Sequence, residues 1–403
     1  MIDFELSDAQ RNIQQFLHWV AESEIRPVSL EADEAHEVPM TLLRKLKELG
    51  VTMDALPGPT SSASAGSGDG DRPVERQGNR IGVLAAEELA WGDAAVAISL
   101  PGAGLGGPPV QMMGTPEQKE RFLGIFKDPE PRWGAYALTE PEAGSDVSGI
   151  RTTCRKDGDH WVLNGTKLFI TNGARASWNV VFATVDPTLG RAGHRVFVVE
   201  KGTRGFQVGR ILDKMGIRAS ETAELLFQDC RVPAENLLGG EERYAQREGF
   251  KAAMQTFDVT RPTVGAMAVG IGRAAFEYTR DRLRQELDLS RPIPRYGVLA
   301  ERLTRMEREL QAARLLVWQA ASMADQRIPN TKEASMAKAY AGTVATRACA
   351  DAVELLGAAG VRHDRWVEKW YRDIKVFDIF EGTGQVQRLV VARRLFEQLG
   401  LRV

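Results

Sequence analysis

The stretch YALTEPEAGSDVSGI, residues 136–150, stands where the sequence changes from helical to strand-like patterning. Before about residue 134 apolar residues recur at helical spacing, whereas from there to about 238 they alternate or cluster in short runs. Glycine, proline and Asx residues separate these runs, as in an all-β domain. The stretch therefore opens a β domain, and its exposed amides and hydroxyls suit a loop that holds a heterocycle edge or a pyrophosphate.

The segments on both sides of this β domain are predicted to be helical. Ser7 is a good N-cap for a first helix, and Gly50 ends an apolar helical face at 42–49. Helical spacing resumes at about 80–100, and long helices return after the β domain, the last of them capped by Thr383. The predicted fold class is α+β, with an N-terminal α-helical domain at 1–132, a middle β-barrel-like or sandwich domain at 133–241 and a C-terminal four-helix-bundle domain at 242–403.

The composition is that of an ordinary soluble globular protein. The chain has 403 residues, of which 43% are apolar and 26% are charged, and its net charge is -2. This balance gives no electrostatic reason to expect nucleic acid or an anionic membrane as a partner. Three widely spaced cysteines, the lack of a signal peptide and the lack of a membrane-spanning segment favour a cytoplasmic location.

Two common kinds of site are disfavoured by the sequence. Gly102, Gly104 and Gly107 fit the dinucleotide spacing G-x-G-x-x-G, but the preceding segment is helical and Pro108-Pro109 are expected to make a poor first turn. We therefore expect a linker between two helices there. The five histidines show no ligand spacing and no G-x-S-x-G elbow is present, so neither a metal site nor hydrolase chemistry is predicted.

A second informative stretch, IFEGTGQVQR at 379–388, places one acid between a hydrophobic pair and a glycine. A carboxylate in apolar surroundings is costly unless it is paired or its pKa rises. Glu381 is therefore either a satisfied turn residue or a base kept ready for a proton. The first basic residue in the stretch is Arg388.

A third stretch, NGTKLFITNG at 164–173, carries an aromatic side chain and a hydroxyl two residues apart. In a regular strand Phe169 and Thr171 point to the same side, which suits a flat ring that also needs a hydrogen bond. A β-hairpin with an ordinary core phenylalanine explains the same pattern.

Several motifs in order resemble those of the acyl-CoA dehydrogenase family. They are TEPEAGSD, LFITNG, MGIRAS (215–220), FQDCRVPAENLLG (227–239), FDVTRP (257–262) and IFEGTGQVQR. The resemblance runs from the N-terminal helices to the C-terminus with few gaps. It implies a flavoprotein enzyme that binds FAD and oxidises an acyl-CoA thioester to its trans-2-enoyl form, with an electron-transfer flavoprotein as the usual acceptor.

The resemblance also implies a catalytic base. In this family the glutamate of the EGT turn removes the α-proton while the β-hydride passes to flavin N5, and Glu381 occupies that position. Its backbone amide hydrogen-bonds the thioester carbonyl in the family. The α-proton of a thioester is a very weak acid, so the base must be close, desolvated and raised in pKa. Some relatives place the base near FDVTRP, where this chain has Thr260, and this strengthens the assignment to Glu381.

Further site residues are implied at matching positions. Leu138 and Thr139 would meet the flavin edge, and Ser145 would meet the pyrophosphate or the pantetheine. Phe169 would cover the ring, and Thr171 would hydrogen-bond near N5. The remaining assignments are Thr383 and Gln385 closing over the cofactor, Asp258 and Arg261 lining the acyl-CoA channel, and Gly382 contacting the substrate. For Arg261, an ion pair with Asp258 that fixes the helix is an equal alternative.

The chain departs from the family on the half of the FAD site that a neighbouring subunit completes in the usual homotetramer. QELDLSRPIPRYG (285–297) lacks the family's R-x-x-F-G motif, and the place of a following glutamine falls at about Gly297. ELLGAAG (354–360) has Glu354 for glutamine and Ala358 for glycine. Because all three losses fall on this one half-site, we expect a homologous acyl-CoA dehydrogenase subunit as the partner, in an α2β2 assembly.

Three alternatives stay open. A homotetramer would require Arg291 or Arg295 to take over the lost phosphate contact. The chain could instead be a flavin-poor structural or assembly subunit of a heteromeric enzyme, although the retention of Glu381 together with Thr139, Ser145 and Thr171 argues against that. An acyl-CoA oxidase-like flavoenzyme differs from a dehydrogenase in oxygen access, which the sequence does not show, whereas flavin monooxygenases usually lack the EGT glutamate.

Overall fold

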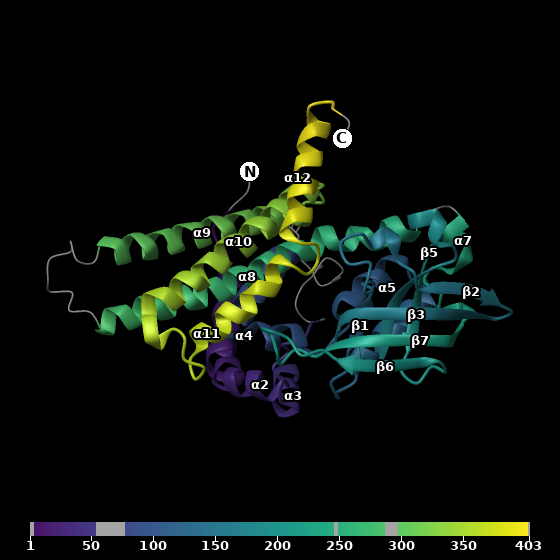
Figure 1. Cartoon of the computed structure of the whole chain (residues 1–403), viewed down its shortest axis with the longest axis horizontal. Helices are drawn as coiled ribbons and strands as arrows, with labels where there is room; N and C mark the ends of the chain where they lie inside the picture. The colour runs from purple at the N-terminus through teal and green to yellow at the C-terminus, as the bar shows by residue number, and fades with distance from the viewer. Residues whose placement is uncertain (1–3, 54–76, 246–248, 287–296, 402–403) are drawn as a thin grey trace, which may run out of the picture.

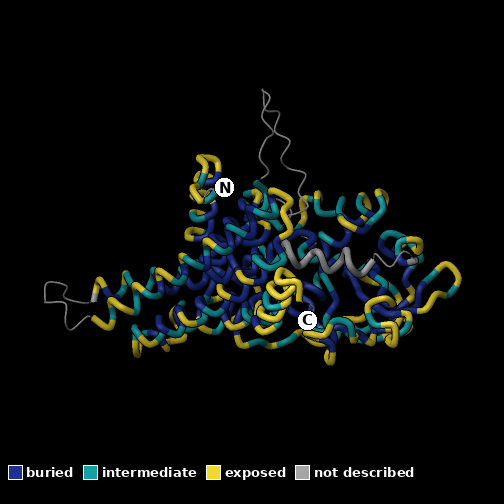
Figure 2. Tube along the Cα trace, turned by 90° about the horizontal axis from the view of Figure 1, so that it is seen from above, coloured by how far each residue is buried: buried dark blue, intermediate teal, exposed yellow. Residues whose placement is uncertain are grey.

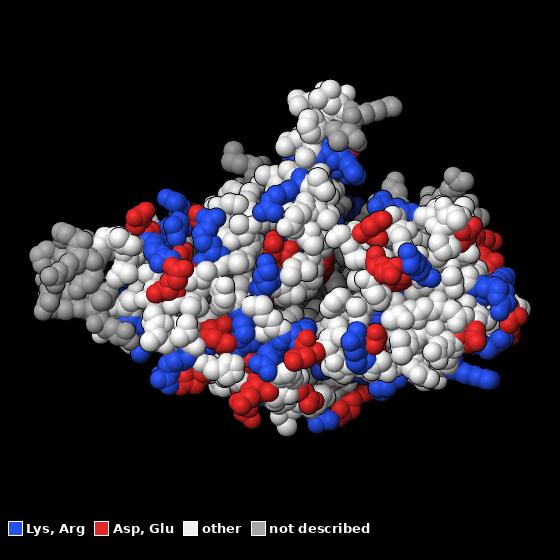
Figure 3. All heavy atoms as spheres, in the orientation of Figure 1, with Lys and Arg blue, Asp and Glu red and all other residues white. Residues whose placement is uncertain are grey.

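Helices precede and follow a β domain in the computed structural model (Figure 1), which confirms the predicted α+β fold class. The structure describes residues 4–53, 77–245, 249–286 and 297–401, and at 245, 249–259 and 286 it describes the backbone alone. Positive and negative side chains are interspersed over the face shown in Figure 3. No helix in these ranges is long and apolar enough to cross a membrane.

The helices before the sheet begin at a strong N-cap. The Ser7 side chain accepts the Gln10 N–H at 3.3 Å, and the Gln10 side chain accepts the Ser7 N–H at 2.9 Å, a reciprocal capping box. Helical backbone continues past the first helix through a π turn and a 3-10 turn into the second. The helices are α1 (Asp8–Val20), α2 (Ser29–Ala35), α3 (Met40–Glu48), α4 (Gly78–Ser99), α5 (Gly107–Met113) and α6 (Pro116–Gly124).

One expectation about this region was wrong. Pro108 and Pro109 do not spoil a first helical turn, because α5 begins at Gly107 and carries prolines in its first positions. The N–H groups of a first turn have no partner within the helix, so proline costs nothing there. The segment before these glycines is helix α4, as predicted, so the glycine run is not a strand–turn–helix phosphate loop.

The middle domain is a curled mixed sheet among the described residues. Its strand order is β1-β4-β2-β3-β7-β6, with β5 paired to β4. β1 and β4 run parallel, whereas β3 pairs antiparallel with both β2 and β7. The strands are β1 (Gly134–Ala137), β2 (Thr153–Asp157), β3 (His160–Thr171), β4 (Trp178–Thr184), β5 (His194–Glu200), β6 (Phe206–Ile211) and β7 (Thr222–Pro233).

Long helices form the C-terminal part. α8, α9 and α10 pack lengthwise against one another (Figure 1), and α4 packs against α8. α12 contacts α10 and then projects from the body of the molecule (Figure 1). The helices are α7 (Gly240–Ala245), α8 (Gly249–Glu286), α9 (Gly297–Asp325), α10 (Thr331–Leu356), α11 (Trp366–Asp373) and α12 (Gly384–Gln398).

The buried hydrophobic residues form two cores. Buried stretches of the chain run through both the helical part and the sheet part of the molecule (Figure 2). One is shared by the N-terminal and C-terminal helices and includes Leu43, Val96 and Ile271. The other fills the sheet and includes Phe197 together with Phe122, which comes from α6. Helices α1–α4 and α8–α11 are therefore one packing unit, and the sheet together with α5 and α6 is a second unit placed against it.

A buried ion cluster joins these two units. Helix α4 is interrupted at Asp93, whose φ of -163° is not helical, and Asp93 Oδ1 accepts the Val96 N–H at 2.9 Å, which caps the second half of the helix. Lys369 Nζ of α11 lies 2.6 Å from Asp93 Oδ2 and 2.5 Å from Asp373 Oδ2. Asp373 Oδ1 accepts the N–H of Ile217, from a loop of the sheet domain, at 2.5 Å. Burial alone would lower the pKa of Lys369, but the two carboxylates raise it above its ordinary value.

Lys369→Met is expected to destabilise the protein by about 3–5 kcal/mol, because it leaves two buried carboxylates without their cation. The measurement is the urea midpoint and slope of unfolding followed by circular dichroism. Lys45→Met is the control: it removes a 2.6 Å ion pair with Glu24 on an exposed lysine. We expect the control to cost about 1 kcal/mol or less, and equal losses in the two variants would contradict the role of the cluster.

Candidate active site

A cavity of about 2350 Å³ lies between the sheet domain, α8 and the turn that precedes α12. Ordinary small-molecule pockets measure roughly 300–1,000 Å³, so this cavity has room for more than one ligand. Gln385 is exposed on α12 and does not line it, and the side chain of Asp258 lies outside the described residues. The other residues predicted from the sequence line it: Leu138, Thr139, Ser145, Phe169, Thr171, Arg261, Glu381, Gly382 and Thr383.

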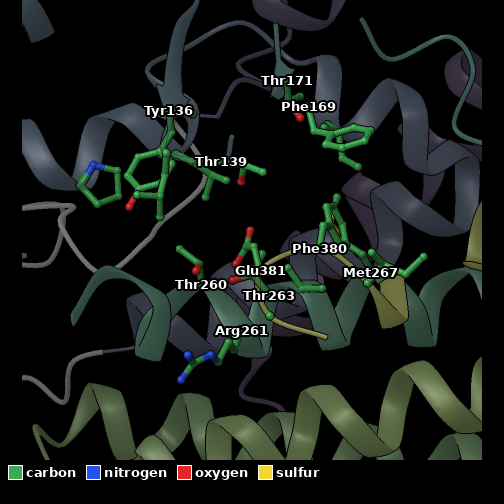
Figure 4. Close-up of a pocket in the computed structure, with 18 of the residues that line it drawn as sticks. Tyr136, Thr139, Phe169, Thr171, Thr260, Arg261, Thr263, Met267, Phe380 and Glu381 are labelled. Atoms are coloured by element: carbon green, nitrogen blue, oxygen red, sulfur yellow. The ribbon is translucent and has the colours of Figure 1, made fainter. Parts of the chain in front are cut away.

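Glu381 sits in a strained turn directly before α12. Its φ of 53° and the φ of 95° at Gly382 both fall in the left-handed region, which costs a non-glycine residue roughly 1–2 kcal/mol. Thr383 ends the turn as the N-cap of α12, its hydroxyl accepting the Val386 N–H at 3.3 Å. Gln387 Nε2 donates to the carbonyl oxygens of Glu381 at 3.2 Å and Gly382 at 3.0 Å. These contacts hold a backbone shape that presents the carboxyl to the cavity (Figure 4).

The Glu381 carboxyl lies beside polar and positive groups of α8 and α10. Burial raises the pKa of this carboxyl, while the Thr260 hydroxyl, Lys338 and Arg261 oppose the rise. The Oε2 atom is buried and has no hydrogen-bond partner among the residues that the structure describes. Figure 4 shows Glu381 between Thr260 and the open space below Thr139, with Arg261 pointing away. An enclosed carboxyl with a raised pKa and a free oxygen meets the requirements of a proton-abstracting base.

The loop after β1 forms the opposite wall and is held by a buried ion pair. Lys167 Nζ donates to Glu140 Oε1 at 2.7 Å and to the Leu138 carbonyl at 3.0 Å. Glu140 also accepts the backbone N–H groups of Arg151 at 2.6 Å and Thr152 at 3.0 Å. Burial alone would raise the pKa of Glu140, but these partners hold it below its usual range, while burial lowers the pKa of Lys167 to about 8. The pair fixes the backbone at Leu138, next to the cavity.

Phe169 and Thr171 face the cavity together, but not because their strand is regular. The pairing of β3 with β7 shifts register between Lys167 and Ile170, and Phe169 has a φ of 61° inside this bulge. Phe169 is therefore 62% exposed on the cavity wall and is not a core phenylalanine of a plain hairpin. It offers a flat apolar surface beside the Thr171 hydroxyl (Figure 4).

Family models match this chain in all three of its parts. They are the N-terminal, middle and C-terminal domains of acyl-CoA dehydrogenase, at residues 7–126, 135–230 and 247–396. The chain belongs to the acyl-CoA dehydrogenase family. It is therefore related to flavin-dependent oxidoreductases over nearly its whole length.

Individual acyl-CoA dehydrogenases are similar to this chain from end to end. The short-chain specific acyl-CoA dehydrogenase of Clostridium acetobutylicum is 36% identical over 98% of this chain and 100% of its own. The structure of butyryl-CoA dehydrogenase from Megasphaera elsdenii is 37% identical, has a TM-score of 0.87, and covers 98% of this chain and 100% of its own. A chain in the structure of the electron transferring flavoprotein of Acidaminococcus fermentans is 37% identical, with a TM-score of 0.86 over 98% of this chain and 99% of its own.

The cavity of this acyl-CoA dehydrogenase family member fits a flavin. Asn172 lines it, is 6% exposed, and its Oδ1 has no hydrogen-bond partner within the described ranges. A buried polar atom of this kind requires a partner, which the polar edge of a bound ring can supply. The exposed Phe169 face and the hydroxyls of Thr139 and Thr171 supply stacking and hydrogen bonds on the same wall.

Sequence reasoning missed several residues that shape this site. Lys167 and Lys338 were not foreseen, although both stand in largely apolar stretches, KLFI and SMAKAYA. A lysine in such a run has to be buried with a partner, so this signal was available. Tyr136 and Met267 also line the cavity, but an apolar pattern cannot distinguish cavity walls from core.

Within the described part of the chain, Gln285, Gly297 and residues 354–360, which stand at the family's neighbour-facing motifs, are not among those that line the cavity. Arg291 and Arg295 lie outside the described residues. Glu354, with a 64% exposed side chain, forms an ion pair with Arg302 of α9, which also binds Asp351 at 2.6 Å. Where the family resemblance calls for a neutral glutamine, this chain therefore presents a paired carboxylate.

Glu381→Gln is expected to raise the urea midpoint of unfolding at neutral pH, because burial penalises the ionised carboxyl in the folded state. The pKa of the Glu381 carboxyl is higher in the folded state than in the unfolded state, so the stability of the wild type falls as the pH rises from the unfolded pKa through the folded one. The advantage of the variant should therefore shrink as the pH is lowered toward the ordinary range of a glutamate. Glu242→Gln, at an exposed position, is the control. An unchanged or lower midpoint for Glu381→Gln would argue against a penalised carboxylate.

Proposed function

We propose that the chain catalyses the FAD-dependent α,β-dehydrogenation of an acyl-CoA thioester to the trans-2-enoyl-CoA. The observation that carries the proposal is the geometry of Glu381. Its carboxyl is presented to a large cavity by a left-handed turn, its Oε2 has no partner in the described chain, and its pKa is raised by burial. End-to-end similarity to acyl-CoA dehydrogenases supports the same reaction.

In this proposal Glu381 takes the α-proton of the thioester onto its carboxylate. The electron pair of the broken C–H bond becomes the α,β double bond as the β-hydrogen leaves with its own electron pair. Bound FAD supplies the acceptor for that hydride. We assign the backbone N–H of Glu381 to the thioester oxygen, where enolate-like charge develops during the reaction. Substrate and FAD filling the cavity would keep water from competing for the proton.

The cofactor belongs on the wall formed by the sheet domain. Leu138 and Thr139 would meet the edge of the ring, Phe169 would cover its face and Thr171 would donate a hydrogen bond, in line with their places on the cavity wall. Ser145 is exposed at the rim, where a phosphate or the pantetheine would pass. Thr383 and Gly382 would close the site from the α12 side, with Arg261 along the acyl-CoA channel. Gln385 and Asp258 stay predictions.

Chemistry and the relatives support proposals for the substrate, the electron acceptor and the compartment. Two of the similar proteins are named for short-chain acyl-CoA or butyryl-CoA, so we assign short acyl chains to this enzyme. The similar chain in an electron transferring flavoprotein structure supports a flavoprotein as the electron acceptor. Cys154, Cys230 and Cys349 are free and buried, as expected in the reducing cytoplasm.

Glu381→Gln should slow the anaerobic reduction of the bound flavin by butyryl-CoA by about 10²–10⁴-fold, because the amide cannot accept the α-proton. Stopped-flow absorbance of the flavin measures this step, and crotonyl-CoA binding should be retained. Glu242→Gln should behave as the wild type. A wild-type rate in Glu381→Gln would remove it as the base. Fast reoxidation of the reduced flavin by oxygen alone would instead favour an acyl-CoA oxidase.

We infer further that the active assembly contains a second, homologous acyl-CoA dehydrogenase subunit in an α2β2 arrangement. The support is the altered half-site: R-x-x-F-G is missing, and Glu354 is committed to Arg302. A carboxylate such as Glu354 would repel the anionic cofactor of a neighbouring subunit. The residues for this chain's own half of the FAD site, in contrast, match the family pattern. The partner would supply the missing contacts.

The chain purified alone should be folded but poor in flavin, and co-expression with its homologous subunit should restore the yellow colour. Visible absorbance per chain, together with the mass from light scattering, measures both properties. One flavin per chain in a homotetramer would refute the heteromer and point to Arg291 and Arg295 as replacement contacts. A flavin-free chain that no homologue restores would favour a structural or assembly subunit.

A further inference from the structure

We propose that Lys338 is a positioning residue for the base: it clamps the Glu381 turn through the Gly382 carbonyl and keeps a positive charge next to the ionised carboxyl. The inference rests on the proposed role of Glu381. Lys338 touches neither the assigned substrate nor the cofactor wall, and it is absent from the cavity lining. Its effect would therefore be transmitted through Glu381.

The clamp is defined by a buried hydrogen bond. Lys338 lies on α10, is 1% exposed, and its Nζ donates to the Gly382 carbonyl at 2.8 Å. The same carbonyl accepts Gln387 Nε2 at 3.0 Å, so both of its lone pairs are engaged. This carbonyl belongs to the peptide that follows the two left-handed residues. Fixing its orientation from two sides opposes relaxation of the strained φ of 53° at Glu381.

Steric contact restricts the same turn. A side chain at Gly382 would collide with Gln387 Nε2, so the hydrogen bond from Gln387 to this turn requires a glycine at position 382. Gln387 itself is 0% exposed, and it lies on α12 while Lys338 lies on α10. The turn is therefore held between two helices that already pack together. The position of the carboxyl depends on helix packing and not on the loop alone.

A lysine is a costly choice for holding a carbonyl. A neutral donor could make the same hydrogen bond without the penalty for burying a charge. Burial lowers the pKa of Lys338 to about 8, with Asp378 and Glu381 raising it and Arg261 lowering it. The ammonium is thus retained at neutral pH beside two carboxyls. A second role, electrostatic support of the ionised base, accounts for the charge.

The groups that influence the Glu381 carboxyl come from three elements, and Asp378, from the segment just before the turn, acts on Lys338. Lys338 belongs to α10, Arg261 and Thr260 to α8, and Tyr136 to β1. Of the two cations, Lys338 opposes the burial-induced rise in the pKa of Glu381 more strongly than Arg261 does. Figure 4 shows the Arg261 side chain directed away from the carboxyl. Lys338 is therefore the cation whose removal should change the base most.

The test compares Lys338→Met and Lys338→Arg with the wild-type flavin-loaded protein. Difference infrared spectroscopy follows the protonated-carboxyl band of Glu381 against pH, assigned by its loss in Glu381→Gln. In Lys338→Met the proton affinity of Glu381 should rise about tenfold, as expected on losing a neighbouring opposite charge. The acidic limb of flavin reduction by butyryl-CoA should move to higher pH by the same amount. Lys338→Arg keeps the charge and should keep the wild-type band.

Lys332→Met is the matched control, since Lys332 lies on the same helix and pairs with Glu333 at 3.3 Å. An unshifted band in a folded Lys338→Met would overturn the proposal. So would a shift in Lys338→Arg or in Lys332→Met as large as the shift in Lys338→Met. If Lys338→Met does not fold, Lys338→Gln replaces it, because it keeps a donor without the charge. The band reports protonation without turnover. A shifted band in a protein that no acyl-CoA reduces would therefore overturn the proposed function while supporting the role of Lys338.

Discussion

The cluster of Lys369 with Asp93 and Asp373 is the contact on which the cavity depends. Helices α1–α4 and α8–α11 share one hydrophobic core, which also takes in Ile217 and Ala219 from a loop of the sheet domain, and the sheet has another. The buried ion cluster adds polar contacts to these apolar ones where the two units meet. Asp373 binds the N–H of Ile217, and the neighbouring Arg372 donates to the carbonyl of Met215 at 3.0 Å. Both loop residues line the cavity. The same carboxylates that restart α4 and anchor α11 therefore also place one cavity wall.

Two buried lysines hold the other walls in the same manner. Lys167 donates to the carbonyl of Leu138 on the cavity-lining loop after β1, and Lys338 donates to the carbonyl of Gly382 beside the candidate base. Burial lowers the pKa of each to about 8. Each pairs a backbone clamp with a nearby carboxylate, from Glu140 in one case and Glu381 in the other. Catalysis gains from such prior organisation, because little rearrangement is then required during the reaction.

Two opposing effects act on the pKa of the Glu381 carboxyl: burial, and the polar and positive groups around it. Burial pushes its pKa upward, toward the range where a carboxylate abstracts protons well, while Thr260, Lys338 and Arg261 restrain the rise. Too little burial would leave a weak base, and too little positive charge would leave it protonated. The strained turn adds a geometric condition, since the carboxyl reaches the cavity from a backbone conformation that few residues adopt unaided.

The sequence alone predicted three features: the succession of helices, sheet and helices, the N-cap at Ser7, and Glu381 as the candidate base. Periodicity, capping and motif spacing are local properties of a sequence, so they can be recognised without a structure. The bulge at Phe169, the break in α4 at Asp93 and the exposure of Gln385 were decided by tertiary structure, since pairing partners and packing override local pattern. The stretch around Glu381 carries no cation before Arg388. Lys338, the lysine that faces Glu381, lies 44 residues from Gly382, whose carbonyl it binds across the contact between α10 and α12. No local rule specifies such a neighbour, because it exists only once the helices have packed.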